Sequence, residues 1–207
     1  MKKIYLSIVL LFGFATQAQL IIDNTTQTPA QLVQNALVGQ GVIPTNIKFN
    51  GSAANALLIR DQVAKFSTNF NPTNLGLDMG LVLATGNATV ALGPNNVANK
   101  SIATATPTAG DADLALLSGQ AIQNVAVVEF DFVATGPTLH FDFVFASEEY
   151  PEYVNSINDS FGFFLSGPGI AGAFSGGAGS SGFAGGNGSL NNPYQIITEG
   201  CLFGWPF

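Results

Sequence analysis

Apolar and polar residues alternate along several segments of this chain, most clearly over residues 126–146, AVVEFDFVATGPTLHFDFVFA. A period of two places every second side chain on the same face of a β-strand. The segment therefore predicts two adjacent strands joined by a turn at residues 134–138, with the phenylalanines facing the core. The opposite, polar face of this hairpin is expected to carry Glu129, Asp131, His140 and Asp142.

Three further segments show the same alternation. Residues 160–167, SFGFFLSG, predict a third core strand, so residues 147–159 are expected to link two neighbouring core strands. Residues 42–52 predict a half-buried strand with Ile47 and Phe49 inward. Residues 76–87 predict another strand, with its leucines on one face and a glycine turn at its end.

Two short helices are predicted from their capping residues. Thr28 is a suitable N-cap, Pro29 occupies the first helical position and Gln31 is placed to close a capping box. An apolar stripe follows and ends at Gly39. A second helix is expected after Asp111, whose carboxylate is a favourable N-cap.

Two segments lack a clear period. Residues 86–108 are rich in Asn, Ala, Thr and Pro, which favours a long loop or a weakly ordered edge. Residues 167–189 are dominated by Gly, Ala and Ser, which is compatible with a linker, a flexible loop or a strand region. Taken with the strands and helices, these patterns predict a mostly β fold, an antiparallel β-sandwich or jelly-roll-like domain with one or two short helices.

The first residues predict export from the cell. Residues 1–18 combine basic residues at positions 2 and 3, an apolar stretch and small residues before Gln19, which is the layout of a cleaved signal peptide. The single cysteine, Cys201, excludes a disulfide framework and a cysteine-rich zinc site. The net charge of −7 disfavours nucleic acid and anionic lipid as partners, and no later segment is long and apolar enough to span a membrane.

Candidate chemistry is concentrated in one acidic segment, residues 147–159, with the sequence SEEYPEYVNSIND. Calcium takes six to eight hard oxygen ligands, often from one irregular loop, so this composition suits a calcium or ligand site. The spacing is not that of an EF-hand, and a solvated acidic loop capped by turn residues is the other interpretation. The oxygen-bearing residues of the segment are Ser147, Glu148, Glu149, Glu152, Asn155, Asn158 and Asp159.

Two catalytic interpretations are weaker. A glycoside hydrolase needs two carboxylates flanking one bond, and Glu149 with Asp159, Glu129 or Asp142 would supply them, but the sequence does not fix their geometry. Because His140 is the only histidine, multi-histidine metal sites are excluded, and a cross-strand partner for a carboxylate is its favoured role. No phosphate-binding glycine motif and no serine-hydrolase motif is present in the sequence.

The order of these motifs resembles the choice-of-anchor L domain of bacterial secreted and surface proteins. The matching segments are IKFNGS, GLDMGLVLATG, GPNN, VVEFDF and FDFVFASEEYPEYVNSINDSFGFFLSGPG, which together span roughly residues 25–170. The resemblance implies an exported domain that lies upstream of varied C-terminal anchors, in many cases in gliding Bacteroidetes, and it carries over no catalytic residue. We therefore expect a choice-of-anchor L-like β domain over residues 19–170.

The chain departs from this family pattern after Gly169. Members continue with further strands and an anchor, whereas residues 171–207 are glycine-rich and end in CLFGWPF. This segment is expected to derive from a truncated or frameshifted reading frame, with no anchor or sorting domain in the chain.

The favoured function is a non-catalytic binding or adhesion domain, exported to the outer surface of a Gram-negative bacterium or beyond it. A partner or ligand, as yet unidentified, would bind at residues 147–159, with Ca2+ as the one cofactor considered. Two alternatives stay open, which are a structural spacer within a larger anchored surface protein and a carbohydrate-active hydrolase that uses Glu149.

Overall fold

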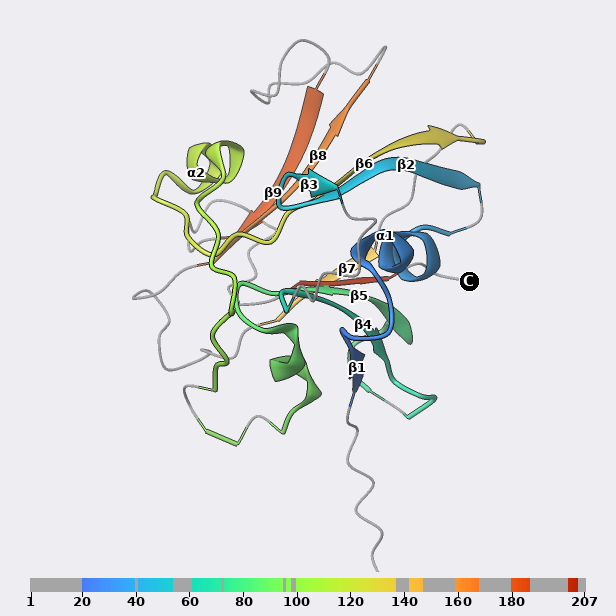
Figure 1. Cartoon of the computed structure of the whole chain (residues 1–207), viewed down its shortest axis with the longest axis vertical. Coiled ribbons are helices and arrows are strands. Elements are labelled where there is room, and N and C mark those ends of the chain that lie inside the picture. The colour runs from blue at the N-terminus through green and yellow to red at the C-terminus, as the bar shows by residue number, and fades with distance from the viewer. Residues whose placement is uncertain are drawn as a thin grey trace, which may run out of the picture.

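The computed structural model describes residues 20–39, 41–53, 61–71, 73–94, 96–97, 100–136, 142–146, 159–167, 180–186 and 201–204. Within these ranges the chain forms antiparallel strands and short helices (Figure 1). The expectation of a mostly β antiparallel fold is therefore confirmed. The strands are β1 (Ile21–Asp23), β2 (Val42–Phe49), β3 (Ser52–Ala53), β4 (Val63–Ser67), β5 (Met79–Leu83), β6 (Val128–Ala134), β7 (Asp142–Phe145), β8 (Ser160–Ser166), β9 (Ser180–Gly186) and β10 (Cys201–Gly204).

The largest sheet has five strands in the order β1-β4-β5-β10-β7, all paired antiparallel. Alternate residues of its strands enter two separate core clusters. Val63 and Leu81 belong to the first cluster, whereas Ala64 and Val82, one position further along each strand, belong to the second. Apolar residues therefore cover both faces of the sheet. The strand predicted over residues 76–87 was expected to bury one face only.

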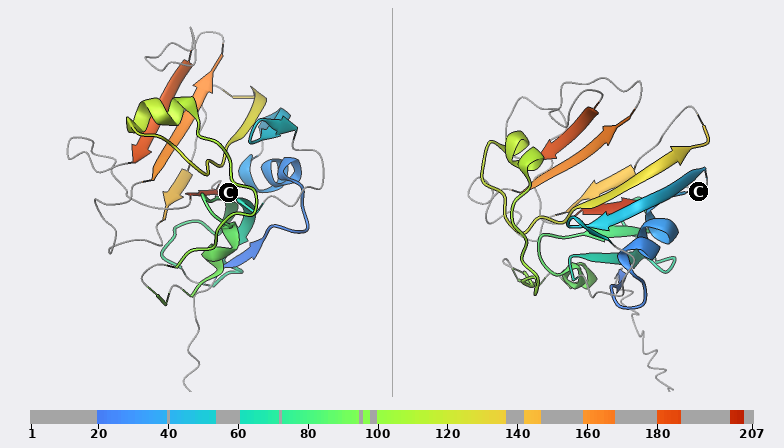
Figure 2. Two further views of the ribbon diagram at one scale, coloured as in Figure 1. Left: turned by 60° about the vertical axis from the view of Figure 1, so that its left-hand side comes forward. Right: turned by 45° about the horizontal axis from the view of Figure 1, so that its top comes forward.

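A three-stranded sheet, β3-β2-β6, lies against the first of these faces. Phe49 at the end of β2 is fully buried in the first cluster, and Ile47 and Val128 pack against that cluster. Figure 2 (right) shows β2 and β6 stacked over the strands of the larger sheet. The two sheets thus form a sandwich around a shared core, in which the inward positions of β2 are the ones predicted by its alternation.

Helix α1 (Pro29–Leu32) begins as its sequence predicts. The hydroxyl of Thr28 accepts the backbone N–H of Gln31 at 3.1 Å, and the side-chain oxygen of Gln31 accepts the backbone N–H of Thr28 at 2.9 Å. Both halves of the capping box are therefore present. The helix continues as the π-helical turn η1 (Val33–Leu37), and buried Leu32 and Val33 carry its apolar stripe into the core.

The remaining elements complete the edges of the fold. The loop predicted over residues 86–108 contains the 3-10 helix η2 (Ala88–Leu92). Helix α2 (Ala112–Ser118) begins at Asp111, whose carboxylate accepts the backbone N–H of Leu114 at 2.9 Å, so this predicted cap is confirmed. Strand β9, in the glycine-rich segment, pairs with β8, so the strand alternative left open for that segment applies to residues 180–186.

The predicted hairpin of residues 126–146 is wrong in its pairing. Strand β6 pairs with β2 in the smaller sheet, whereas β7 pairs with β10 in the larger sheet. The expected third strand, β8, pairs with β9 in a separate ribbon. Strands β6 and β7 both contribute to the first core cluster, Val128 from β6 and Phe143 and Phe145 from β7, although they belong to different sheets. Phe130 and Phe132 of β6, which were expected to face the core, are half-buried and belong to neither core cluster. The pattern therefore predicted the strands correctly but not their neighbours.

Candidate functional site

The acidic segment predicted as the binding site lies between β7 and β8. Residues 147–158, with Ser147, Glu148, Glu149, Glu152, Asn155 and Asn158, fall outside the described residues. Asp159, the last member of the set, is described as a half-buried residue directly before β8. The structure therefore describes the residues that flank this segment, at the end of β7 and the start of β8.

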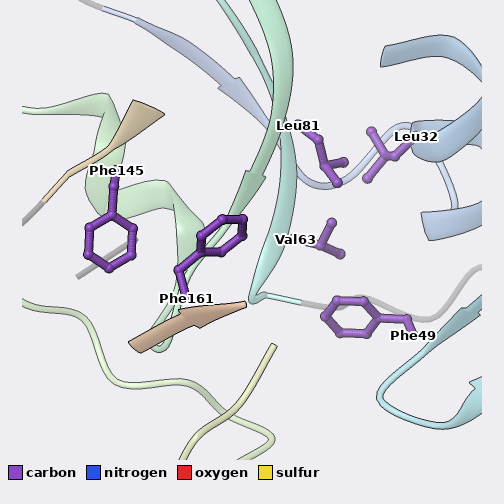
Figure 3. Packing of buried hydrophobic residues seen from close by; sticks show 6 residues of the cluster. All are labelled: Leu32, Phe49, Val63, Leu81, Phe145 and Phe161. Carbon is purple, nitrogen blue, oxygen red and sulfur yellow. The ribbon is translucent and has the colours of Figure 1, made fainter. Parts of the chain in front are cut away.

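Both ends are fixed in the same aromatic cluster. Phe145, the last residue of β7, and Phe161, the second residue of β8, are each 8% exposed. Their ring centroids lie 6.2 Å apart, and the ring of Phe143 lies 5.1 Å from that of Phe161. Figure 3 shows Phe145 and Phe161 next to each other within the first core cluster. Aromatic pairs at this separation stabilise a structure beyond the area that they bury.

Strand registers locate the point at which the acidic segment leaves the larger sheet. Phe145 lies opposite Cys201, Cys201 lies opposite Leu83, and Leu83 lies opposite Val63. These four residues therefore mark one end of the sheet. Strand β7 ends at this end of the sheet, which is also the end at which residues 61 and 62 enter β4.

The secondary polar face does not form as predicted. Glu129 and Asp131 are exposed on β6, whereas Asp142 is half-buried on β7 in the other sheet, and His140 lies outside the described residues. Strands β6 and β7 belong to different sheets, so the carboxylates on them do not lie on one shared face. Asp131 instead accepts a hydrogen bond from the amide of Asn46 at 2.6 Å.

A buried carboxylate, Asp61, was missed by the sequence analysis. It is 6% exposed and accepts the Thr104 hydroxyl at 2.7 Å, the Ala105 backbone N–H at 2.5 Å and the Thr106 hydroxyl at 3.4 Å. Its backbone carbonyl also accepts the N–H of Ala88 at 2.6 Å. Asp61 therefore connects the loop before α2 and the start of η2 to the start of β4.

The neighbouring side chain, Gln62, is 1% exposed and satisfies its hydrogen-bonding groups inside the protein. Its amide nitrogen donates to the carbonyls of Thr85 and Asn124 at 3.2 and 2.9 Å, and its oxygen accepts from Asn50 at 3.2 Å. Asn50 in turn accepts the N–H of Val127 at 2.8 Å. These bonds join three loops at one end of the sandwich. The sequence signal that could have indicated this buried cluster is a pair of polar residues directly before an apolar strand.

This buried polar cluster is structural in character. Every polar atom named in it has a partner within the chain, which leaves no free group for a substrate. Among the described residues, no group of three or more His, Cys, Asp or Glu side chains lies together in a way that suits a metal ion. The acidic segment is therefore the part of the chain in which a cation site is still to be tested.

One carboxylate has a shifted pKa. Hydrogen bonds from the Thr26 hydroxyl and from the backbone N–H groups of Thr25 and Thr26 hold the pKa of Asp23 below its ordinary value of 3.8, and slight burial opposes them. These bonds favour the charged form because a carboxylate is the stronger acceptor. Asp23 ends β1 and closes a turn before α1, so its role is also structural.

Comparison with protein families matches the Choice-of-anchor L domain over residues 21–177, which is more than half of the chain. Comparisons with curated proteins and with solved structures give no match. No helix in the described ranges is long and apolar enough to cross a membrane. The chain therefore belongs to the choice-of-anchor L domain family, a non-enzymatic type of domain found in surface or secreted proteins.

Proposed function

We propose that this domain binds a partner at the cell surface through its acidic segment, residues 147–159, and that calcium organises this segment. The observation that carries the proposal is the aromatic clamp formed by Phe143, Phe145 and Phe161, which holds both ends of the segment in the core. Binding residues in proteins are often carried on loops that a rigid scaffold positions. An acidic segment held in this way is suited to present its carboxylates together.

Calcium is the cation that this composition favours. The segment contains four of the thirteen acidic residues of a chain in which only 9% of residues are charged. Four carboxylates close together in sequence repel one another, and a divalent cation would offset this repulsion. Carboxylate and amide oxygens are the ligands that calcium takes, and this chain has too few histidines and cysteines for a zinc site.

The spacer alternative differs in what the segment does. In a spacer, the carboxylates keep the surface soluble, and their neutralisation leaves partner attachment unchanged. The hydrolase alternative requires Glu149 and a second carboxylate about 5 Å away for retention, or further for inversion. Release of product from a polysaccharide that is lost in Glu149→Gln would support the hydrolase, and release that survives this change would exclude Glu149.

Thermal unfolding with millimolar calcium and with excess chelator tests the proposal. A site held at about 100 times its dissociation constant stabilises the folded state by about 2.7 kcal/mol. In a domain of this size that free energy raises the melting temperature by roughly 5–10 °C. Magnesium at the same concentration serves as the ionic control, since it prefers a stricter octahedral site and retains its water.

A matched pair of double variants assigns the effect to the segment. Glu148→Gln with Glu149→Gln removes two charges from it, and Asp78→Asn with Glu129→Gln removes two charges from exposed positions elsewhere. We expect the first variant to lose the calcium shift and the second to keep it. Equal melting temperatures in calcium and chelator for the unmodified chain would refute calcium organisation of this segment.

A further inference from the structure

The connection between β4 and β5 carries a second feature that the acidic segment does not explain. Phe70, in this connection, is 97% exposed, the largest exposed fraction among the apolar side chains described. A fully exposed phenylalanine gains almost nothing from burial within its own chain. Its ring is therefore available to a partner. Figure 1 shows the connection between β4 and β5.

The backbone presents this ring at a sterically unfavourable position. Asn69 and Phe70 both have positive φ, at 49° and 61°, and the N–H of Asn71 donates to the carbonyl of Thr68 at 2.9 Å. Two consecutive residues of positive φ inside such a bond form a type I′ turn. Asparagine is favoured at the first of these positions and glycine at the second, where a bulky residue is an outlier. A phenylalanine at this position strains the backbone of the turn, and its exposed ring does not offset that cost by packing within the chain.

The residues next to Phe70 in sequence are mostly polar and carry no charge. No charged residue occurs between Ser67 and Asp78. Asn69, Asn71 and Asn74 are exposed, and each of their side-chain amides offers both donors and an acceptor. An aromatic face bordered by neutral amides is the chemistry that recognises a sugar, because the ring packs on sugar C–H groups and the amides bond to hydroxyls.

We propose that the turn at Asn69–Asn71 binds a neutral polysaccharide, with the Phe70 ring stacked on one sugar unit. The absence of charge in this connection disfavours an acidic polymer, and the chain's net charge of −7 opposes one further. A lipid surface is also disfavoured, since peripheral membrane segments combine a broad apolar face with basic residues. The connection has no basic residue, and its one fully exposed apolar side chain, with the half-exposed Ile21 opposite Ser67, is not a broad apolar face.

The turn that carries Phe70 and the end of β7, after which the acidic segment begins in sequence, lie at opposite ends of the five-stranded sheet. Ser67 lies opposite Met79 at one end of the five-stranded sheet, whereas Val63, Leu83 and Phe145 mark the other end. The turn that carries Phe70 follows Ser67 directly, and the acidic segment follows Phe145. The polysaccharide proposal is therefore independent of calcium, and the two can fail separately.

Retention of the full chain on insoluble cellulose, chitin, β-1,3-glucan, starch and mannan tests this proposal. We expect binding to at least one of them, a loss of roughly tenfold or more in Phe70→Gly, and retention in Phe70→Trp. Ile43→Ala is the matched control, because Ile43 is 60% exposed on another sheet. Glycine suits the positive φ, so Phe70→Gly should fold with an unchanged or higher melting temperature.

Three outcomes would overturn the proposal, and a chelator control separates it from the acidic segment. Absence of retention on all five polysaccharides, or equal retention of the unmodified chain and Phe70→Gly, would show that the Phe70 ring does not bind these sugars. Size-exclusion chromatography with light scattering would detect the main rival, a second copy of the chain. A dimer that dissociates in Phe70→Gly, without polysaccharide binding, would assign the ring to self-association. Retention that persists in chelator separates the turn from the acidic segment.

Discussion

Replacement of Asp61 by alanine should destabilise the domain strongly without touching its apolar core. The change removes the acceptor for the Thr104 hydroxyl at 2.7 Å and for the Ala105 N–H at 2.5 Å. Hydrogen bonds to a charged group contribute about 1.5–3 kcal/mol each, and the third contact, at 3.4 Å, adds little. Since the loop gains entropy when it is released, we expect a net loss of about 3 kcal/mol.

Two milder variants separate the contributions of the Asp61 charge and of one of its hydrogen bonds to this loss of stability. Asp61→Asn can turn its oxygen to the Ala105 N–H and its amide nitrogen to the Thr104 hydroxyl, which can accept as well as donate, so it keeps both contacts and loses the negative charge. We expect it to cost about 1–2 kcal/mol. Thr104→Val removes one hydroxyl from the same carboxylate and should cost about 1 kcal/mol.

Urea unfolding measures these differences, because a shift in midpoint at constant slope reports stability alone. A loss of about 3 kcal/mol corresponds to a fall of roughly 6–12 °C in melting temperature for a domain of this size. Hydrogen exchange at the Ala105 amide gives a local readout, since this N–H donates to Asp61. The exposed Asp78→Asn is the control, with an expected change within about 0.5 kcal/mol. An Asp61→Ala stability within that same margin would refute the role given to this carboxylate.

Three further predictions concern the cap, the core and the first turn. Thr28→Ala should lose about 1 kcal/mol in urea unfolding, whereas Thr28→Ser should retain most of the capping box. Phe49→Ala should lose about 3–5 kcal/mol by the same measurement, because Phe49 is fully buried in the shared core. Asp23 has a lowered folded pKa, so its contribution is present above pH 3.8 and is lost as the pH falls through the folded value. Asp23→Asn should therefore be less stable than the unmodified chain at pH 7, and the difference should shrink as the pH falls below 3.8, as followed by thermal unfolding across pH.

The predictable parts of the fold are those with local signals. The capping box of Thr28 and Gln31 depends on residues three positions apart, and it formed as the sequence indicated. The inward positions of β2 and β8 follow from strand alternation alone. In each case the information needed lies within one turn of helix or one strand, so distant parts of the chain do not change the answer.

Strand pairing was not predictable in the same way. A period of two specifies which face of β6 is inward, and that face is satisfied equally by any antiparallel neighbour in the same layer. The turn residues between β6 and β7 favoured a hairpin, but β2 pairs with β6 along most of its length, from Val42 opposite Ala134 to Phe49 opposite Val128. Long-range pairing of this kind depends on the whole core, and the chain's local pattern does not encode it.

Buried polar residues were also beyond the sequence. Asp and Gln are mostly exposed in folded proteins, so nothing in their identity indicates that Asp61 and Gln62 are buried. Burial of such groups is stable only when each finds its partners. Those partners, at Thr85, Ala105 and Asn124, lie 23 to 62 residues away in sequence from Asp61 and Gln62. Local patterns therefore do not indicate the bonds that order this end of the domain.

The division of the sheet into two ends has a consequence for function. At the end marked by Phe145, Phe145 and Phe161 flank the acidic segment in sequence and pack together, and the Asp61 and Gln62 cluster lies at this same end of the sheet. At the other end, the turn after Ser67 projects one exposed ring and several amides beyond the core. A surface module with a contact at each end can bind a cation-dependent partner and a polysaccharide at the same time without competition between them. We expect the free energies of the two proposed binding events to be additive, because Phe145 and Ser67 lie at opposite ends of the sheet.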